Sequence, residues 1–124
     1  MNALWVFVGG GLGALARHGI AVILPNPTFS SGQLPWATLL ANFLACLVLG
    51  YGLALILRGQ LGRGGELLLL TGFCGGFSTF STFAYELLQL YQNGHAVAAV
   101  LYLLLSLLTG VGALVGLFYL LDLT

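Results

Sequence analysis

Four long apolar runs dominate the pattern of this chain, and short polar or proline-containing segments separate them. The runs cover residues 3–24, 36–57, 66–91 and 96–121. Each has at least the length of about 20 residues with which a helix crosses the hydrocarbon core of a bilayer. The pattern therefore predicts an all-α membrane protein in which residues 1–124 form a single domain of four transmembrane helices.

The composition agrees with this pattern and removes several classes of function. Of the 124 residues, 60% are hydrophobic and only 5% are charged, which is far from the composition of an average soluble domain. Three basic and three acidic residues leave no net charge, so the chain has no basic surface for nucleic acid. It has no lysine and therefore no P-loop motif, and its short connections leave no room for a nucleotide-driven domain.

The first apolar run does not look like a removable signal peptide, because its start is uncharged and glycines are spread through it. We therefore expect it to stay in the mature protein as a packed helix. Pairs of small residues four positions apart allow helices to approach closely, either within one chain or across a dimer. These pairs are Gly9 and Gly13, Gly10 and Ala14, Ala41 and Ala45, and Gly112 and Gly116.

The basic residues give a weak indication of orientation. Arg58 and Arg63 lie between the second and third runs, whereas Arg17 lies toward the opposite end of the first run. Basic residues near the ends of spans favour the cytoplasmic side, so the bias amounts to two against one. We expect so small a bias to permit both orientations, and a chain that inserts both ways can form an antiparallel dimer.

The third run is unusually polar at its centre. Gly72, Gly75 and Gly76 are followed by four hydroxyl residues within five positions. Each glycine weakens a helix by about 1 kcal/mol relative to alanine, so we expect the helix to break at these glycines. A break inside the membrane exposes carbonyl groups that bind a cation and N–H groups that bind an anion. The alternative is a continuous helix whose hydroxyls bond to its own carbonyls.

Two further features of the spans each allow two interpretations. Phe77, Phe80 and Phe83 recur every three residues, so on a continuous helix they lie close to one face. Such a stripe is usually core packing, but the positive edges of aromatic rings also suit a small anion. Asn42 lies within the second run, where its amide either bonds to another helix or faces a pore as a donor.

A polar stripe runs along the last apolar run. Tyr102, Ser106 and Thr109 or Gly110 are spaced by four and then three or four residues, so they share one side of a helix. The stripe either lines a path through the membrane or pairs with the hydroxyls of the third run.

Few ionisable residues lie within the runs. Arg17 is long enough to reach an interface by snorkelling, which is the default expectation, although it can also draw anions to a pore mouth. Glu86 either pairs with a basic residue or caps the polar region. His18 and His95 flank spans, and the sequence assigns them no role.

Three segments of the chain resemble the Fluc (CrcB-type) fluoride channels. They are the glycine-rich residues 9–14 with Arg17, residues 35–42 at the start of the second run, and residues 72–83 with Glu86. The most specific part is the sequence Gly-Gly-Phe-Ser-Thr-Phe-Ser-Thr-Phe at residues 75–83, and the similarity extends over the whole chain.

The resemblance implies a passive channel and not an enzyme. Members of the family are dual-topology homodimers of the cell inner (plasma) membrane, with two antiparallel pathways and a third helix that is broken near its centre. They export fluoride from the cytoplasm and so reduce its toxicity. The implied partners are fluoride, a structural sodium ion at the dimer interface, a second copy of the chain and the lipid membrane.

The site residues of the family match particular positions of this chain. The resemblance implies that the backbone carbonyls of Gly75 and Ser78 hold the sodium ion; many relatives have threonine in place of Ser78, which leaves a carbonyl ligand unchanged. The implied fluoride pathway uses Asn42, Phe80, Phe83, Ser81, Thr82, Tyr102, Ser106 and Arg17. Gly110 and Gly112 stand where some relatives have hydroxyls, so the far end of the polar track differs here.

Two other functions share parts of the pattern. A small proton-coupled multidrug-type exporter depends on an acidic residue in the membrane, and only Glu86 could serve here. A non-transporting subunit of a larger membrane complex would have the same four helices without a path of its own.

Overall fold

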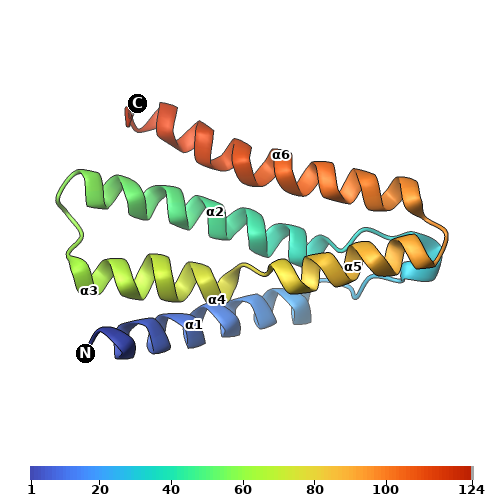
Figure 1. Ribbon diagram of the computed structural model, residues 1–124, viewed down its shortest axis with the longest axis horizontal. Helices are drawn as coiled ribbons and strands as arrows, with labels where there is room; N and C mark the ends of the chain where they lie inside the picture. The colour runs from blue at the N-terminus through green and yellow to red at the C-terminus, as the bar shows by residue number, and fades with distance from the viewer. Residues whose placement is uncertain (124) are drawn as a thin grey trace.

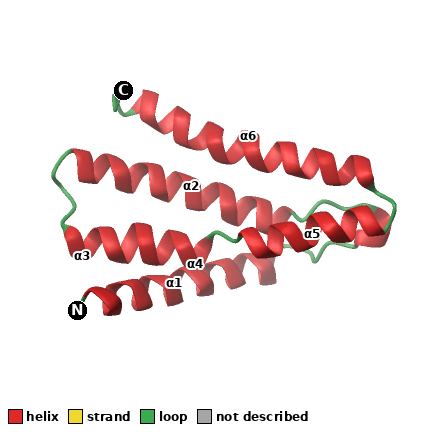
Figure 2. Ribbon diagram, in the orientation of Figure 1, coloured by secondary structure: helices red, strands yellow, loops and turns green. Residues whose placement is uncertain are grey.

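The computed structural model describes residues 1–123 and is a bundle of helices without a β-strand in that range (Figures 1 and 2). Four helical segments are long and apolar enough to cross a membrane. They are α1 (Asn2–Ile23), α2 (Trp36–Leu57), a third span over Arg63–Gln92 and α6 (Ala96–Leu120). Each bound lies within three residues of the one expected from the sequence.

The third span consists of several parts. It begins as α3 (Arg63–Glu66), widens into the π-helix η2 (Leu67–Cys74) and ends its first half as α4 (Gly75–Phe77). Two residues of extended backbone follow, and α5 (Phe80–Gln92) then continues in nearly the same direction (Figure 2). The expected break near the centre of the third helix is therefore present.

The position of the break differs from the prediction. Ser78 and Thr79 are the extended residues, with ψ angles of 156° and 119°. Gly72, Gly75 and Gly76 all lie within helical segments, so the prediction that the helix breaks at the glycines was wrong. Their helix-weakening effect is offset by packing, because two of them let this helix approach α1 closely.

Close backbone contact between α1 and the first half of the third span explains these glycines. A Cβ atom on Gly9 would overlap the carbonyl oxygen of Leu68, and one on Gly13 would overlap that of Phe73. From the other side, a Cβ atom on Gly76 would overlap the carbonyl oxygen of Gly10. The small-residue pairs of α1 therefore serve packing within one chain, whereas Gly112 and Gly116 of α6 face open space.

The buried side chains form two clusters, one on each side of the break. Ala41 and Ala45 of α2 pack with Phe77 of α4, and Leu39 packs with Phe83 and with residues of α5 and α6. The expectation that Phe77, Phe80 and Phe83 share one helical face is corrected here. Because the residues between α4 and α5 are extended, the side chain of Phe77 packs in one cluster and that of Phe83 in the other.

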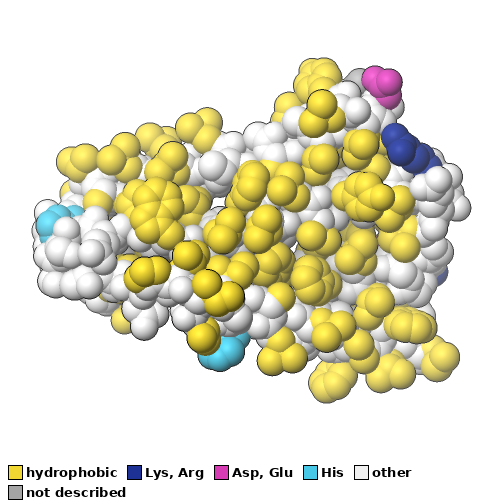
Figure 3. All heavy atoms as spheres, turned by 180° about the vertical axis from the view of Figure 1, so that it is seen from behind, with side chains coloured by type: hydrophobic (Ala, Val, Ile, Leu, Met, Phe, Trp, Pro, Cys, Tyr) yellow, Lys and Arg dark blue, Asp and Glu magenta, His cyan; other side chains and the backbone are white. Residues whose placement is uncertain are grey.

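The outer surface of the bundle is apolar. Figure 3 shows hydrophobic side chains over much of one face, and the basic and acidic side chains visible on that face lie at one end of the long axis. The exposed apolar residues come from every span and include Phe7, Trp36, Phe80 and Leu108. A surface of this kind suits lipid or another apolar protein surface and not water.

The connection between α1 and α2 is held against the other hairpin of the bundle. It contains the short 3₁₀ helix η1 (Phe29–Ser31), and the ring Nε2 of His95 donates a hydrogen bond to the Ser30 carbonyl at 3.0 Å. His95 stands at the start of α6. This contact gives His95 a structural role that the sequence did not indicate.

We expect Gly9→Ala to lower the free energy of unfolding by about 1–3 kcal/mol, because the added methyl group meets backbone that cannot move aside. Gly11→Ala is the matched control, since a Cβ at Gly11 meets nothing within 4 Å. Its helix propensity should leave stability unchanged or raise it by up to about 1 kcal/mol. Unfolding of the purified protein in detergent measures both variants, and equal effects would contradict the packing of α1.

Candidate functional site

The break in the third span is braced by the side chain of Asn42. Its Nδ2 donates to the Thr79 carbonyl at 3.3 Å, and the Thr79 N–H donates to its Oδ1 at 2.7 Å. The side-chain amide of Asn42 therefore satisfies both the N–H and the carbonyl of Thr79. Of the two roles considered for Asn42, the structure shows a hydrogen bond to a neighbouring span. One Nδ2 hydrogen is left for another acceptor.

Thr79 also forms the N-cap of α5. Its Oγ1 accepts the N–H of Thr82 at 3.3 Å and lies 3.1 Å from the Thr82 hydroxyl and 3.4 Å from that of Ser81. Such a cap satisfies one of the free N–H groups of a helix start. The hydroxyls of Ser81 and Thr82 thus gather on the side chain of Thr79, at the positive end of the dipole of α5.

The carbonyl groups around the break do not all find partners. The Cys74 carbonyl accepts from the N–H and the hydroxyl of Ser78, at 2.9 and 2.7 Å. The Gly76 carbonyl accepts from Nε of Arg17 at 3.2 Å. Among residues 1–123, no side chain and no residue of a connecting segment donates to the carbonyl oxygens of Gly75 and Ser78.

These two oxygens fit the ligands of a small hard cation. Carbonyl oxygens are ligands of this class of ion, and freed carbonyls inside a membrane span need a partner. Gly75 is exposed on the single chain and Ser78 is half-buried, so the first of the two oxygens belongs to a residue at the surface of the chain. That these two carbonyls hold sodium, as the family resemblance implies, stays a prediction.

A hollow of about 290 Å³ opens beside the break. Its wall contains four of the predicted pathway residues, namely Asn42, Phe80, Phe83 and Ser106. The remaining wall residues are Cys46, Ser78, Thr79, Leu107 and Gly110. The hydroxyl oxygen of Ser106 is buried and has no hydrogen-bond partner within the described part of the chain. Ser106 therefore lines the hollow and carries an unpaired hydroxyl, whose oxygen is itself covered in the single chain.

The two phenylalanines of the hollow differ in exposure. The ring of Phe83 is buried, whereas Phe80 keeps 79% of its surface exposed. Their ring centroids lie 6.1 Å apart at an angle of 51°, so the rings are tilted and not stacked. The hollow is therefore bounded on one side by a side chain that the single chain leaves uncovered.

Glu86 lies on α5 one turn beyond Phe83 and is buried. Oε1 accepts from the Thr38 hydroxyl at 2.7 Å, and Oε2 accepts from the Tyr102 hydroxyl at 2.7 Å. The cluster ties α2, α5 and α6 together, and the ring of Tyr102 packs edge to face with that of Phe83, with centroids 5.1 Å apart. Of the two roles expected for Glu86, pairing with a basic residue is excluded, because its carboxyl oxygens accept hydrogen bonds from the hydroxyls of Thr38 and Tyr102 instead.

Thr38 and the hydroxyl partners of Glu86 were not predicted from the sequence. One signal for the pair was present, because Glu86 and Tyr102 lie eight residues before and eight residues after Gly94, the glycine in the turn between α5 and α6. Residues equally distant from the turn of a helical hairpin lie side by side. Nothing in the sequence pointed to Thr38, which is a single hydroxyl in an apolar helix.

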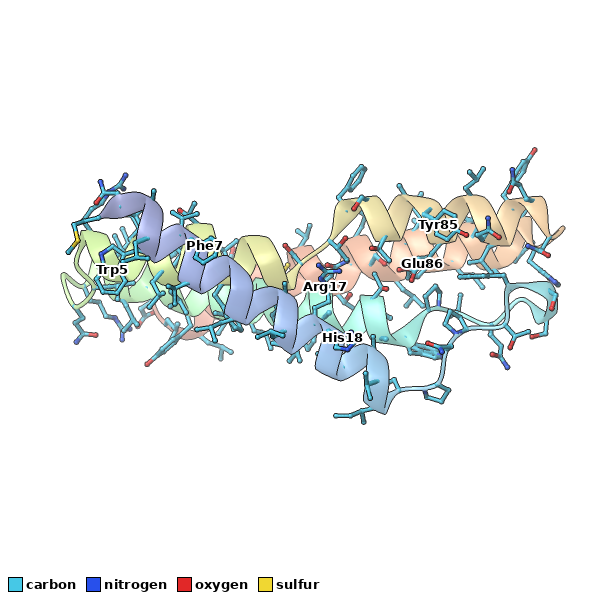
Figure 4. The ribbon with its side chains drawn as sticks, turned by 90° about the horizontal axis from the view of Figure 1, so that it is seen from below. Trp5, Phe7, Arg17, His18, Tyr85 and Glu86 are labelled. Carbon is cyan, nitrogen blue, oxygen red and sulfur yellow. The ribbon has the colours of Figure 1, made fainter. Side chains whose placement is uncertain are left out.

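Arg17 does not snorkel toward the end of α1. Figure 4 shows it near the middle of the molecule, where its side chain reaches the backbone at the break. It belongs neither to the wall of the hollow nor to an ion pair, since the one salt bridge within residues 1–123 joins Arg63 and Glu66 at 2.9 Å. The expected counterweight to Arg58 and Arg63 at the opposite end is therefore absent.

The polar stripe of α6 has three separate environments. The Tyr102 hydroxyl is held by Glu86, Ser106 lines the hollow, and the Thr109 hydroxyl donates to the Leu105 carbonyl of its own helix at 2.7 Å. The structure thus brings Ser106 and Gly110 of this stripe to the hollow, and it does not bring Tyr102 or Thr109 there.

Residues 4–117 match the family described as CrcB-like protein, Camphor Resistance (CrcB). The chain belongs to this family. Its CrcB-like relatives include the Pectobacterium carotovorum protein named fluoride-specific ion channel FluC, which is 44% identical over 107 residues, covering 84% of this chain and 80% of the relative. The FluC protein of Thermus thermophilus is 39% identical and covers 91% of this chain and 97% of its own. Together with the four apolar spans, membership makes this a multi-pass membrane protein.

We expect Asn42→Ala to destabilise the protein by about 1–3 kcal/mol, because it leaves the N–H and carbonyl of Thr79 without partners inside the membrane. Thr109→Ala serves as the control, since its hydroxyl bonds to the backbone of its own helix. Unfolding in detergent compares the two. Wild-type stability of the Asn42 variant would contradict a bracing role for this amide.

Proposed function

We propose that this chain is a passive, fluoride-selective channel of the plasma membrane that exports fluoride from the cytoplasm. The observation that carries the proposal is the hollow at the break, where a free hydroxyl and aromatic rings meet the start of a half-helix inside a membrane span. The relatives that cover most of the chain are named fluoride-specific channels.

The chemistry of the hollow suits a small anion. The start of α5 contributes the positive end of a helix dipole, and the edges of aromatic rings carry partial positive charge. Ser106 adds a hydroxyl that has no partner, and Asn42 adds its second amide hydrogen. No acidic or basic side chain lines the hollow, so an ion is held by several weak donors and can leave again.

A passive path is sufficient for this task. Fluoride enters cells as neutral HF from acidic surroundings and is trapped as an anion in the more alkaline cytoplasm, from which the membrane potential drives it outward. A proton-coupled exporter would need an acid that exchanges protons with the transport path. Glu86, the one acid within the described spans away from their ends, is buried, bonded to two hydroxyls and absent from the wall of the hollow.

The working form that we propose is an antiparallel homodimer whose copies insert in opposite orientations. Two observations support a second copy: Phe80 is exposed beside the hollow, and the free carbonyl of Gly75 belongs to an exposed residue. With Arg17 held at the break, Arg58 and Arg63 set the orientation bias, which amounts to two arginines. A bias of this size is compatible with insertion in both directions.

A structural sodium ion is part of this proposal. The carbonyl oxygens of Gly75 and Ser78 would hold it at the interface of the two copies. Its charge would compensate the partial negative charges of carbonyls that have no hydrogen-bond donor. The side chains around the break have the separate task of holding these carbonyls in place, through Asn42 and Arg17.

Fluoride efflux from liposomes tests the function. With a potassium ionophore to set the voltage, purified protein should release fluoride rapidly and chloride far more slowly. We expect Phe80→Ile and Phe83→Ile to reduce fluoride efflux at least about tenfold, because an aliphatic side chain has no positive ring edge. Phe7→Ile, an exposed position on α1, is the matched control. Unchanged efflux in both hollow variants would remove the ring-edge mechanism, and no efflux from folded wild type would remove the function.

Insertion in both directions has its own test. A reporter fused to the C-terminus, active on one side of the membrane, and a second reporter active on the other side should both give signal, because the arginine bias is small. Adding two arginines to the segment between α1 and α2 should shift the ratio of the two signals. Signal from one side alone would contradict dual topology.

A further inference from the structure

Arg17 is a charged side chain in the interior of a span without a charged partner. Its guanidinium is half-buried, and among the described residues no carboxylate forms an ion pair with it. Glu86, the other ionisable side chain deep in the spans, is matched by two hydroxyl donors. A charge in this position is costly in lipid and is retained where it has a function.

The position of Arg17 relates it to the free carbonyls at the break. Its Nε occupies the carbonyl oxygen of Gly76, which follows Gly75 directly in the last turn of the first half-helix. This contact has two effects on the carbonyl set. It occupies one lone pair of the Gly76 oxygen and so weakens this oxygen as a cation ligand, and it places a fixed positive charge one residue from Gly75.

We propose that Arg17 makes the carbonyl site selective for monovalent over divalent cations. The inference rests on the sodium site of the proposed function. The repulsion between a fixed charge and a bound ion is twice as large for a divalent ion as for a monovalent one, and in the dimer two Arg17 side chains act on one site.

The number of available oxygens acts in the same direction. With Arg17 in place, Gly75 and Ser78 of two copies provide two times two, or four, oxygens. Without it, Gly76 would be free as well, and two times three gives six. Calcium binds about six to eight oxygens, so removing Arg17 brings the site into the range of calcium. Arg17 is therefore a positioning residue that controls both the charge and the size of the ligand set.

Cation-dependent stability of the full chain measures this selectivity without reference to transport. The purified protein in detergent is exchanged into choline chloride, and its unfolding midpoint is followed during titration with sodium chloride or calcium chloride at matched ionic strength. A cation that binds only the folded protein raises the midpoint. We expect wild type to respond to sodium and not to calcium.

Two substitutions at position 17 separate charge from shape. Arg17→Met removes the charge and the donor but keeps a long apolar stem, and we expect its apparent affinity for calcium to rise at least about tenfold. Arg17→Lys keeps the charge and should keep the wild-type order of cations. Arg58→Gln, at the exposed end of α2, is the control for a general change in net charge and should behave as wild type.

Three results would overturn the inference: stabilisation of wild type by calcium as strong as by sodium, a wild-type order of cations in Arg17→Met, or loss of all cation response in that variant. If Arg17→Met does not fold, the wild-type comparison and Arg17→Lys still decide it. Fluoride efflux is measured on the same preparations. Efflux with no cation response in wild type would remove this inference alone, whereas sodium selectivity without efflux would support it and remove the proposed channel function.

Discussion

The two hydrogen bonds between Asn42 and Thr79 are the interaction on which the rest of the site depends. Lipid offers no partner to a free N–H or carbonyl, so a helix can stop within a membrane only where protein satisfies the groups it releases. An asparagine amide has a donor and an acceptor on one rigid plane and can serve both groups of a single residue. Thr79 can therefore stay extended, and the chain can begin a new helix at Phe80.

Opposite chemistry then follows on the two sides of this brace. The first half-helix ends in carbonyls, of which Cys74 and Gly76 are occupied and Gly75 is free. The second half-helix begins with N–H groups, one of which is capped by Thr79. A single break thus provides an electronegative end and an electropositive end a few residues apart, which explains how one short segment can serve a cation and an anion.

Periodicity and composition were sufficient to predict the four spans, because a helix in lipid needs a long apolar surface and little else. The glycines of the third span were misinterpreted for a physical reason. Propensity measures the cost of glycine in an isolated helix, while Gly72 and Gly76 lie where backbone meets backbone and a Cβ would clash. Close packing outweighed helix propensity. The helix is interrupted at Thr79 instead, where Asn42 bonds to the exposed backbone groups.

The site itself was predictable only in part. Asn42 was singled out as an amide in an apolar run, and Phe80, Phe83 and Ser106 by their spacing. The four residues line one hollow, and their part in a fluoride path stays a prediction. The partners that hold them were not found, since a hydrogen bond between residues 37 positions apart leaves no periodic trace. Family resemblance supplied roles for single positions but not the contacts between them.

A carboxyl group one turn from an anion path needs a physical explanation. Glu86 is bonded through both oxygens to hydroxyls of α2 and α6, and it is turned away from the hollow that Phe83 borders. The two donors compensate the carboxyl oxygens locally, and the rings of Phe83 and Tyr102 pack edge to face with centroids 5.1 Å apart. Glu86 therefore acts on the hollow through position, because it fixes Tyr102, whose ring packs against that of Phe83.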